Sequence, residues 1–182
     1  MHPSVIIQLA ILAASQVLAA PAEPASQSYA VNILLEKRAN PAPVTCGPSS
    51  DERAWPLQSV QNAFNALIAN APKDNADKPR AGNRYYPRRF GNPTPSDATV
   101  VAALDAIPEC KTGQANMGYT EFPLTDPVFT GGATNSQGLD RVLAISGPPA
   151  ADGTVTYTYC LAMTHRGHGA GDGGVDPCVN AP

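Results

Sequence analysis

The sequence predicts an α+β fold stabilised by disulfides, in which one main α-helix packs on a curved antiparallel β-sheet. Apolar residues recur at helical spacing between residues 56 and 70. From residue 117 onward, segments alternate apolar and polar residues or are rich in Thr, Tyr and Val, as strands are. A helix followed by a run of strands is typical of α+β domains. The third observation is an even number of cysteines, four in all.

The first 38 residues are predicted to be processing sequence rather than part of the fold. Val5–Ala14 is an apolar core too short to span a bilayer, and small residues follow it, so we assign residues 1–19 to a signal peptide. Residues 20–38 resemble a propeptide that ends at the dibasic pair Lys37-Arg38; the alternative is an uncleaved, disordered leader. We therefore expect a secreted, extracellular protein with a single domain at 39–182 and no membrane anchor.

All four cysteines lie in this domain, which indicates two disulfides in a secreted chain. The sequence allows three pairings. We favour Cys46 with Cys178, which would tie the ends of the domain together, and Cys110 with Cys160, which would staple an inner strand. A zinc site is not expected, because the chain has no Cys-x-x-Cys pair.

The charge of the whole chain does not draw it to nucleic acid, because the formal net charge is −3. Ten of the twelve basic residues follow residue 38, and five of those ten lie within 78–89. A local basic patch on an acidic protein can bind a polyanion, although a solvated loop with ordinary charges has the same composition. The five residues are Lys78, Arg80, Arg84, Arg88 and Arg89.

The main helix is predicted to begin at Pro56, because proline suits a first helical turn, and to end near Asn70. Residues 71–84 are predicted to be a polar loop that leads to a short extended segment, Tyr85–Phe90. A second, shorter helix is predicted over Asp97–Ile107, which contains an apolar run.

Three strands are predicted after this helix: 117–124, 139–144 and 153–164. Cys160 and His165 are five residues apart, so a regular strand would turn them to opposite faces of the sheet. We therefore expect a disulfide at Cys160 to hold the buried back of the sheet while His165 faces the front. A β-bulge between the two residues would reverse this expectation.

Each of the last three strands presents one polar side chain at or near its end: Glu121, Arg141 and His165. A carboxylate, a permanent cation and an imidazole are the groups that break a phosphodiester without a metal, because they accept a proton, stabilise phosphoryl charge and return a proton. Taken singly, each has an ordinary structural reading: a surface carboxylate, its cross-strand ion-pair partner and a hydrogen-bonded residue at a strand end.

Several short motifs between Cys46 and Cys178 match a known family in order and approximate spacing. The chain resembles the fungal guanyl-specific ribonucleases and their ribotoxin relatives, which show Tyr-Pro-His, Glu-Trp-Pro, Gly-Gly, Asp-Arg-Val and Thr-His segments and bond the last cysteine to one near the mature start. The matching segments here are Tyr86-Pro-Arg-Arg-Phe90, Glu121-Phe-Pro123, Gly131-Gly132, Asp140-Arg-Val142, Thr164-His165 and Cys178.

The resemblance implies a microbial ribonuclease-like fold and a role for each residue. Glu121 would take the proton of the ribose 2′-hydroxyl, and His165 would protonate the departing 5′-oxygen. Arg141, as a third catalytic residue, and the Tyr86 hydroxyl would contact the phosphate and the charge that builds on it. The product would be a 2′,3′-cyclic phosphate and the substrate RNA rather than DNA. We expect no metal or other cofactor, and a monomer.

The sequence departs from the family at two places. Arg88 stands where the family has a catalytic histidine, and arginine can bind phosphate but cannot exchange a proton near neutral pH. The loop that holds guanine in the family keeps only one ring, Phe90, together with Asn92, as base-binding candidates. Two functions are therefore expected: an endoribonuclease, or a weakened ribonuclease-like effector that binds RNA or a host protein.

Overall fold

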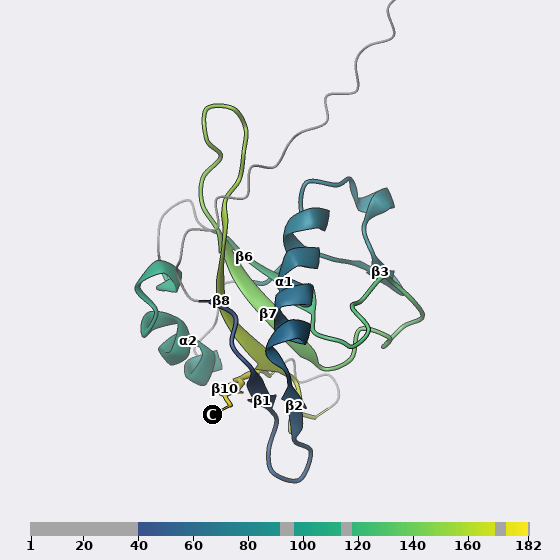
Figure 1. Ribbon diagram of the computed structural model, residues 1–182, viewed down its shortest axis with the longest axis vertical. Helices are drawn as coiled ribbons and strands as arrows, with labels where there is room; N and C mark the ends of the chain where they lie inside the picture. The colour runs from purple at the N-terminus through teal and green to yellow at the C-terminus, as the bar shows by residue number, and fades with distance from the viewer. Residues whose placement is uncertain (1–39, 92–96, 114–117, 170–173, 182) are drawn as a thin grey trace, which may run out of the picture. The chain divides into compact units, whose positions relative to one another are not determined.

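A five-stranded antiparallel sheet forms the centre of the structure (Figure 1). Its strands lie in the order β5, β6, β7, β8, β9, so each strand pairs with its neighbour along the chain. This simple order leaves the three inner strands, β6, β7 and β8, with a partner on each side. The bounds of the strands are Arg88–Arg89, Gly118–Pro123, Asp140–Ser146, Tyr157–Thr164 and Asp176–Pro177.

The computed structural model describes residues 40–91, 97–113, 118–169 and 174–181. The expected signal peptide and the expected propeptide lie outside the described residues. Every described residue belongs to one unit, Asn32–Pro182.

Five further strands complete two small antiparallel sheets. One sheet joins the two ends of the unit, because β10 pairs with β1 and β1 pairs with β2. The other is a two-stranded hairpin of β3 and β4. The bounds are Val44–Cys46 for β1, Arg53–Trp55 for β2, Arg80–Ala81 for β3, Arg84–Tyr85 for β4 and Val179–Asn180 for β10.

The main helix, α1 (Leu57–Asn70), lies where the sequence predicted it, with Pro56 at its N-cap. It contains no internal glycine or proline, and one side of it is apolar. That side packs on the back face of the central sheet, which we define by Phe122, Val142 and Ala144. The buried apolar residues of the helix are Val60, Ala63, Phe64, Leu67 and Ile68.

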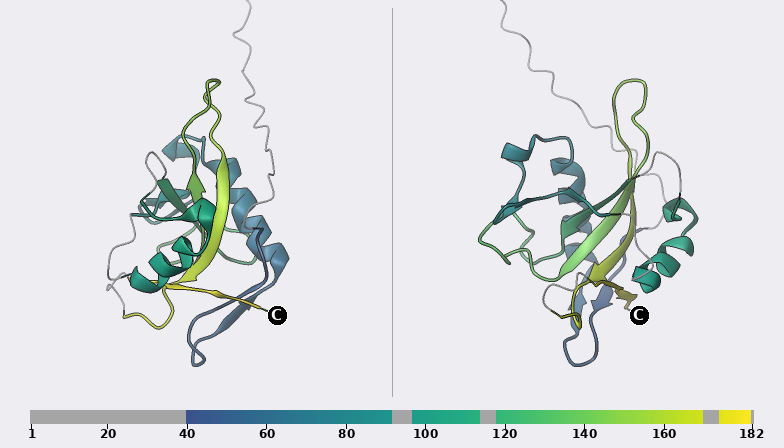
Figure 2. Two further views of the ribbon diagram at one scale, coloured as in Figure 1. Left: turned by 90° about the vertical axis from the view of Figure 1, so that its left-hand side faces the viewer. Right: turned by 180° about the vertical axis from the view of Figure 1, so that it is seen from behind.

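The second helix, α2 (Ala98–Asp105), covers part of the opposite, front face (Figure 2). We define the front face by Tyr119, Leu143 and Met163, which share a core cluster with Val100 and Leu104 of α2. The sheet therefore has a helix on each face, rather than one main helix alone. The fold is mixed, with antiparallel sheets.

Both expected disulfides are present. Cys46–Cys178 joins β1 to the segment between β9 and β10. Cys110–Cys160 joins a 3₁₀ turn that follows α2 to the middle of β8, so it holds α2 against the front face. None of the helices in the described residues has the length and apolar character to cross a bilayer.

The expected separation of Cys160 and His165 on opposite faces is wrong. Leu143 pairs with Leu161 but Ala144 pairs with Tyr159, so Cys160 is an extra residue in a β-bulge. The bulge turns Cys160 toward the front-face cluster, together with Leu161 and Met163. Alternation from Met163 then carries His165 to the same face.

The strand predicted from residue 153 begins only at Tyr157. The opposing turn contains Pro148 and Pro149, which have no N–H group to extend the ladder. Residues 147–156 are held instead by turn hydrogen bonds, among them the Ala150 N–H with the Thr154 carbonyl at 2.8 Å.

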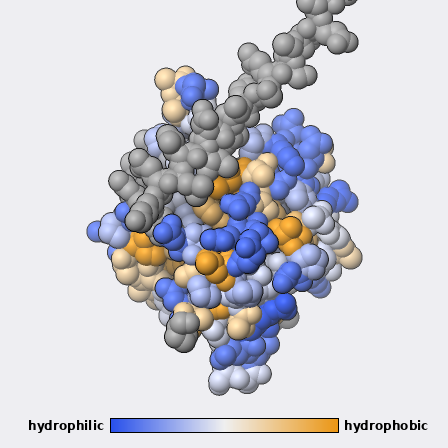
Figure 3. Space-filling model, in the orientation of Figure 1, coloured by the Kyte–Doolittle hydropathy of each residue, from blue (hydrophilic) through white to orange (hydrophobic). Residues whose placement is uncertain are grey.

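The segment 71–84, predicted to be a loop, contains a 3₁₀ turn (Asn75–Asp77) and the β3–β4 hairpin. The hairpin contacts the loop after β6 through the Gly132 N–H, which donates to the Arg80 carbonyl at 2.9 Å. Figure 3 shows a strongly hydrophilic surface at the upper right, over this segment.

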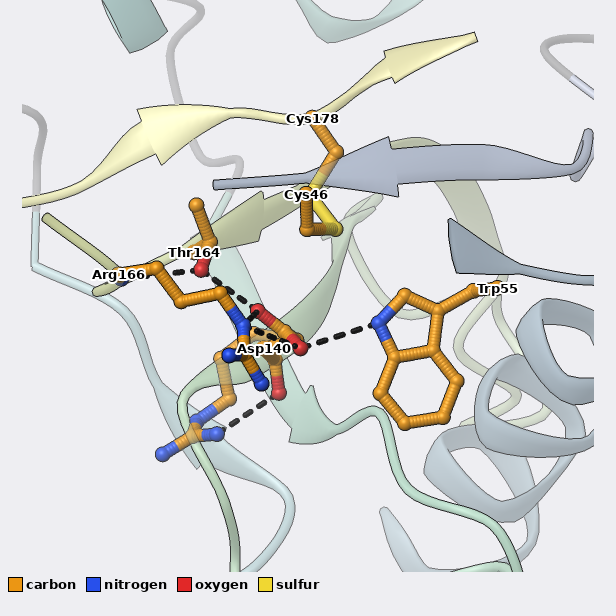
Figure 4. The surroundings of a disulfide bond; sticks show 7 residues. Cys46, Trp55, Asp140, Thr164, Arg166 and Cys178 are labelled. Atoms are coloured by element: carbon orange, nitrogen blue, oxygen red, sulfur yellow. Dashed lines mark hydrogen bonds and ion pairs between the residues drawn. A yellow bond between two sulfur atoms is a disulfide. The ribbon is translucent and has the colours of Figure 1, made fainter. Parts of the chain in front are cut away.

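A buried carboxylate organises the end of the sheet nearest the Cys46–Cys178 disulfide (Figure 4). Asp140, 1% exposed, accepts hydrogen bonds from Trp55 Nε1 at 3.0 Å and from Thr164 Oγ1 at 2.5 Å. It also pairs with Arg166 Nε at 3.1 Å, and Arg166 continues to Asp51 at 2.7 Å. One acidic group thus connects β2, β7, β8 and the loop after β8.

We predict that Asp140→Ala lowers the free energy of unfolding by about 3–5 kcal/mol, because it leaves buried donors and the Arg166 charge without their acceptor. Urea denaturation followed by tryptophan fluorescence measures the loss. Asp77→Ala, which removes an exposed carboxylate, is the control and should stay within about 0.5 kcal/mol of the parent. Equal effects of the two substitutions would contradict the assigned role of Asp140.

Candidate active site

The register of the sheet brings the three predicted polar side chains to one face. Arg88 is opposite Glu121, and Glu121 is opposite Leu143 of β7. Residues directly opposite one another share a face, so Glu121 and, two positions before Leu143, Arg141 lie on the front face. The His165 N–H donates to the Leu139 carbonyl at 3.0 Å, which extends the same ladder by one step. The front face therefore carries all three.

Glu121 is completely buried, with 0% of its surface exposed. Its Oε1 atom accepts a short hydrogen bond from Arg88 Nε, so the two form an ion pair. Its Oε2 atom is buried and has no hydrogen-bond partner among the described residues. Arg88 is 38% exposed and thus stands between the carboxylate and the solvent.

Tyr86 lies beside both guanidinium groups. The Cζ atoms of Arg88 and Arg141 are 5.7 Å and 5.8 Å from the centre of its ring, within the range of cation–π attraction. Phe122 and Phe129 pack edge-on against the same ring. The phenol is fully buried, and its hydroxyl has no hydrogen-bond partner in the described part of the chain.

Backbone carbonyl groups hold the guanidinium group of Arg141 in place. Its Nη1 atom donates to three carbonyl oxygens, those of Gln137, Gly138 and Asp140, at 2.7–3.1 Å. The side chain is 2% exposed, and its Nε atom is buried without a partner among the described residues. Arg141 is thus a fixed positive charge whose position its own loop determines.

The imidazole of His165 is held in a defined tautomer. Its Nδ1 atom lies 2.9 Å from the carbonyl oxygen of Gly174, and a carbonyl can only accept, so Nδ1 carries a hydrogen. Nε2 is the nitrogen left to meet a ligand. Burial lowers the pKa of His165 below its usual value, and the charges of Arg141 and Arg88 lower it further. The Gly174 hydrogen bond and the charge of Glu121 act in the opposite direction.

Three buried polar atoms in this region share one property: each lacks a hydrogen-bond partner among the described residues. They are Tyr86 Oη, Glu121 Oε2 and Arg141 Nε. Leaving such atoms unpaired is costly in a folded protein, and unpaired buried groups gather at functional sites. A hydroxyl, a carboxylate oxygen and a guanidinium N–H can together bind a group that both donates and accepts hydrogen bonds, as a ribose phosphate does.

The predicted base-binding residues are only partly accounted for. Phe90 packs against the cluster beneath α2, and its N–H donates to the Tyr119 carbonyl at 3.0 Å. Asn92 lies outside the described residues. His168, close to His165 in sequence, pairs with Asp176 at 3.0 Å.

Asp140 and its partners were not found by reading the sequence. The Asp-Arg-Val motif drew attention to Arg141, whereas the neighbouring Asp140 fixes the strand ends. Trp55 was the available signal, because a lone tryptophan in a core needs an acceptor for its N–H.

No group of three or more His, Cys, Asp or Glu side chains suited to a metal ion occurs within the described ranges.

No protein-family model matches the chain, and no curated protein and no solved structure matches it either.

We predict energetic coupling between Arg88 and Glu121. Arg88→Ala should cost about 1–3 kcal/mol of unfolding free energy, because it leaves a buried carboxylate unpaired. The same substitution should cost less in a Glu121→Gln background, and urea denaturation of the four proteins measures the difference. Arg89→Ala, on the neighbouring exposed residue, should change stability by less than about 0.5 kcal/mol. A coupling energy of zero would show that the ion pair does not form in solution.

Proposed function

We propose that this protein is a secreted endoribonuclease that cleaves RNA by transesterification to a 2′,3′-cyclic phosphate without a metal. The observation that carries the proposal is the common face of Glu121, Arg141 and His165, with the unpartnered atoms of Tyr86, Glu121 and Arg141 beside one another in the fold. The electrostatic influence of Glu121 and Arg141 on His165 agrees with this grouping.

In the proposed reaction, Glu121 accepts the proton of the ribose 2′-hydroxyl through Oε2, the oxygen that Arg88 does not occupy. The 2′-oxygen forms a bond to phosphorus while the bond from phosphorus to the 5′-oxygen breaks. Protonated His165 gives the Nε2 proton to the departing 5′-oxygen. Because the attacking group is the 2′-hydroxyl, DNA is not a substrate.

Three groups would stabilise the charge that grows on the phosphoryl oxygens. Arg141 supplies a fixed cation, and Arg88 supplies a second one that can turn away from Glu121. The Tyr86 hydroxyl supplies a hydrogen bond. Arg141 and Tyr86 are oriented before substrate arrives, because backbone carbonyls hold Arg141 and packed rings hold Tyr86.

Arg88 also limits the reaction. While it pairs with Glu121, the carboxylate is neutralised and closed off from solvent. A substrate phosphate must draw the guanidinium away before the 2′-hydroxyl can reach Oε2. We infer that substrate binding opens the site, and that turnover is slow compared with a site that has histidine in place of Arg88.

Fold and location belong to the same proposal. A helix on the back of a bent antiparallel sheet, with the polar groups on the front, supports a microbial ribonuclease-like fold and the resemblance to the fungal ribonucleases and ribotoxins. The amino-terminal apolar segment and the two disulfides support secretion. We propose that the protein acts on RNA as a monomer, because one chain supplies all the residues of the candidate site.

A second candidate function is favoured by the Arg88–Glu121 ion pair itself. In this alternative the protein is a ribonuclease-like effector that binds RNA or a host protein and cleaves little or nothing. A carboxylate that a neighbouring arginine holds permanently cannot act as a base, but the cations around it still bind phosphate.

Incubation of the purified mature protein with RNA in EDTA distinguishes the two candidates. We predict cyclic-phosphate products from the wild type and none from Glu121→Gln/His165→Gln. Arg88→His should raise kcat/KM by about 100-fold, because it restores a group that exchanges protons. Arg53→His, on an exposed arginine of β2, is the matched control and should leave kcat/KM unchanged.

If neither the wild type nor Arg88→His cleaves RNA while both bind it, the endoribonuclease proposal is wrong and the second candidate replaces it.

A further inference from the structure

A second surface, separate from the candidate active site, is suited to RNA. It is a groove of about 780 Å³ between the carboxyl end of α1, the segment 73–80 and the loop 128–132. Three cations line it, Lys73, Lys78 and Arg80, against one carboxylate, Asp77. Its volume is within the range of sites that hold a small organic group such as a nucleotide.

The charge around this groove contrasts with the rest of the domain. Residues 73–89 contain six of the ten basic residues that follow residue 38, but only two of the thirteen acidic ones. Lys78, Arg80, Arg84 and Arg89 make no ion pair with any described residue. Lys73 donates a hydrogen bond to the Asn70 side chain at 2.8 Å and keeps its full charge. These charges are therefore available to a polyanion.

Apolar residues line the groove beside the cations. Val128, Phe129 and Pro79 are among them. Gly131, with φ at 110°, allows its loop to approach the β3 backbone, where the Gly132 N–H donates to the Arg80 carbonyl at 2.9 Å. Cations together with apolar side chains are the combination that binds single-stranded nucleic acid, because bases pack on the apolar groups and phosphates meet the cations.

The groove and the candidate active site share a wall. Phe129 lines the groove, and its ring also packs on Tyr86 with 5.6 Å between the ring centres. Arg80 pairs with Tyr85 and Ala81 pairs with Arg84, so Arg80 and Arg84 lie on opposite faces of the hairpin, and of these two only Arg80 lines the groove. The groove is therefore connected to the candidate active site through the ring of Phe129.

We propose that this groove binds the sugar–phosphate backbone of single-stranded RNA outside the nucleotides that occupy the candidate active site. The proposal goes beyond the proposed function, because it requires RNA binding and not cleavage. On this proposal the groove supplies affinity for long RNA. A dinucleotide is too short to reach the groove, so substitutions in the groove should not change its affinity.

The test uses the Glu121→Gln/His165→Gln background, in which RNA is not cleaved, and a fluorescent 20-nucleotide RNA. Lys78→Gln/Arg80→Gln removes two groove charges; Arg53→Gln/Lys111→Gln removes two charges elsewhere and is the charge-matched control. Fluorescence anisotropy between 50 and 200 mM salt gives affinity and its salt dependence. The groove variant should lose about tenfold in affinity at 100 mM salt, with the slope of log K against log salt smaller by about 1.4.

A variant that should gain affinity separates the effect of groove charge from a loss of affinity caused by misfolding. Ala76→Lys adds a cation to the groove lining and should raise affinity severalfold, with a slope steeper by about 0.7. Equal losses in the groove variant and its charge-matched control would overturn the proposal. A groove-dependent affinity for poly-glutamate without affinity for RNA would also overturn it and would identify an acidic protein as the partner. Because catalysis is absent from the assay, neither result depends on the proposed cleavage.

Discussion

The buried carboxylate of Asp140 is the constraint on which the candidate site depends. It pairs across strands with Thr164 and accepts hydrogen bonds from Trp55 and Thr164, while Arg166 balances its charge. The next residue after Asp140 is Arg141, and the next after Thr164 is His165. The contacts that hold Asp140 and Thr164 in place therefore also fix the positions of Arg141 and His165. Only a carboxylate with several donors is stable at this depth, because an unpaired buried charge is too costly.

The second constraint is the distribution of cover over the two faces. The bulge at Cys160 turns its disulfide toward α2, so that the helix is tied over one end of the front face. The back face is filled by α1. The same arrangement explains why His165 is half-buried and why its pKa is lowered chiefly by burial.

The sequence was informative where a pattern is local and regular. The α1 stripe, the strand alternation and the even cysteine count predicted the main helix, the strand positions and the disulfides. It failed where one residue changes the register, because a bulge has no sequence signature at Cys160. It also failed for Asp140, since an isolated aspartate is normally exposed and its donors are far away in the chain. The Arg88 substitution was recognised, but its direct contact with Glu121 follows from cross-strand pairing that only the structure gives.

Phe129 joins the two surfaces described above, and Arg88 closes the candidate base, Glu121. That account requires Glu121 and His165 to interact electrostatically across the front face. NMR titration of the His165 imidazole measures this directly, with His168→Gln to assign the signal. Because the charge of Glu121 raises the pKa of His165, Glu121→Gln should lower that pKa below the wild-type value, whereas Asp105→Asn should not change it. An unchanged His165 pKa in Glu121→Gln would contradict the common site.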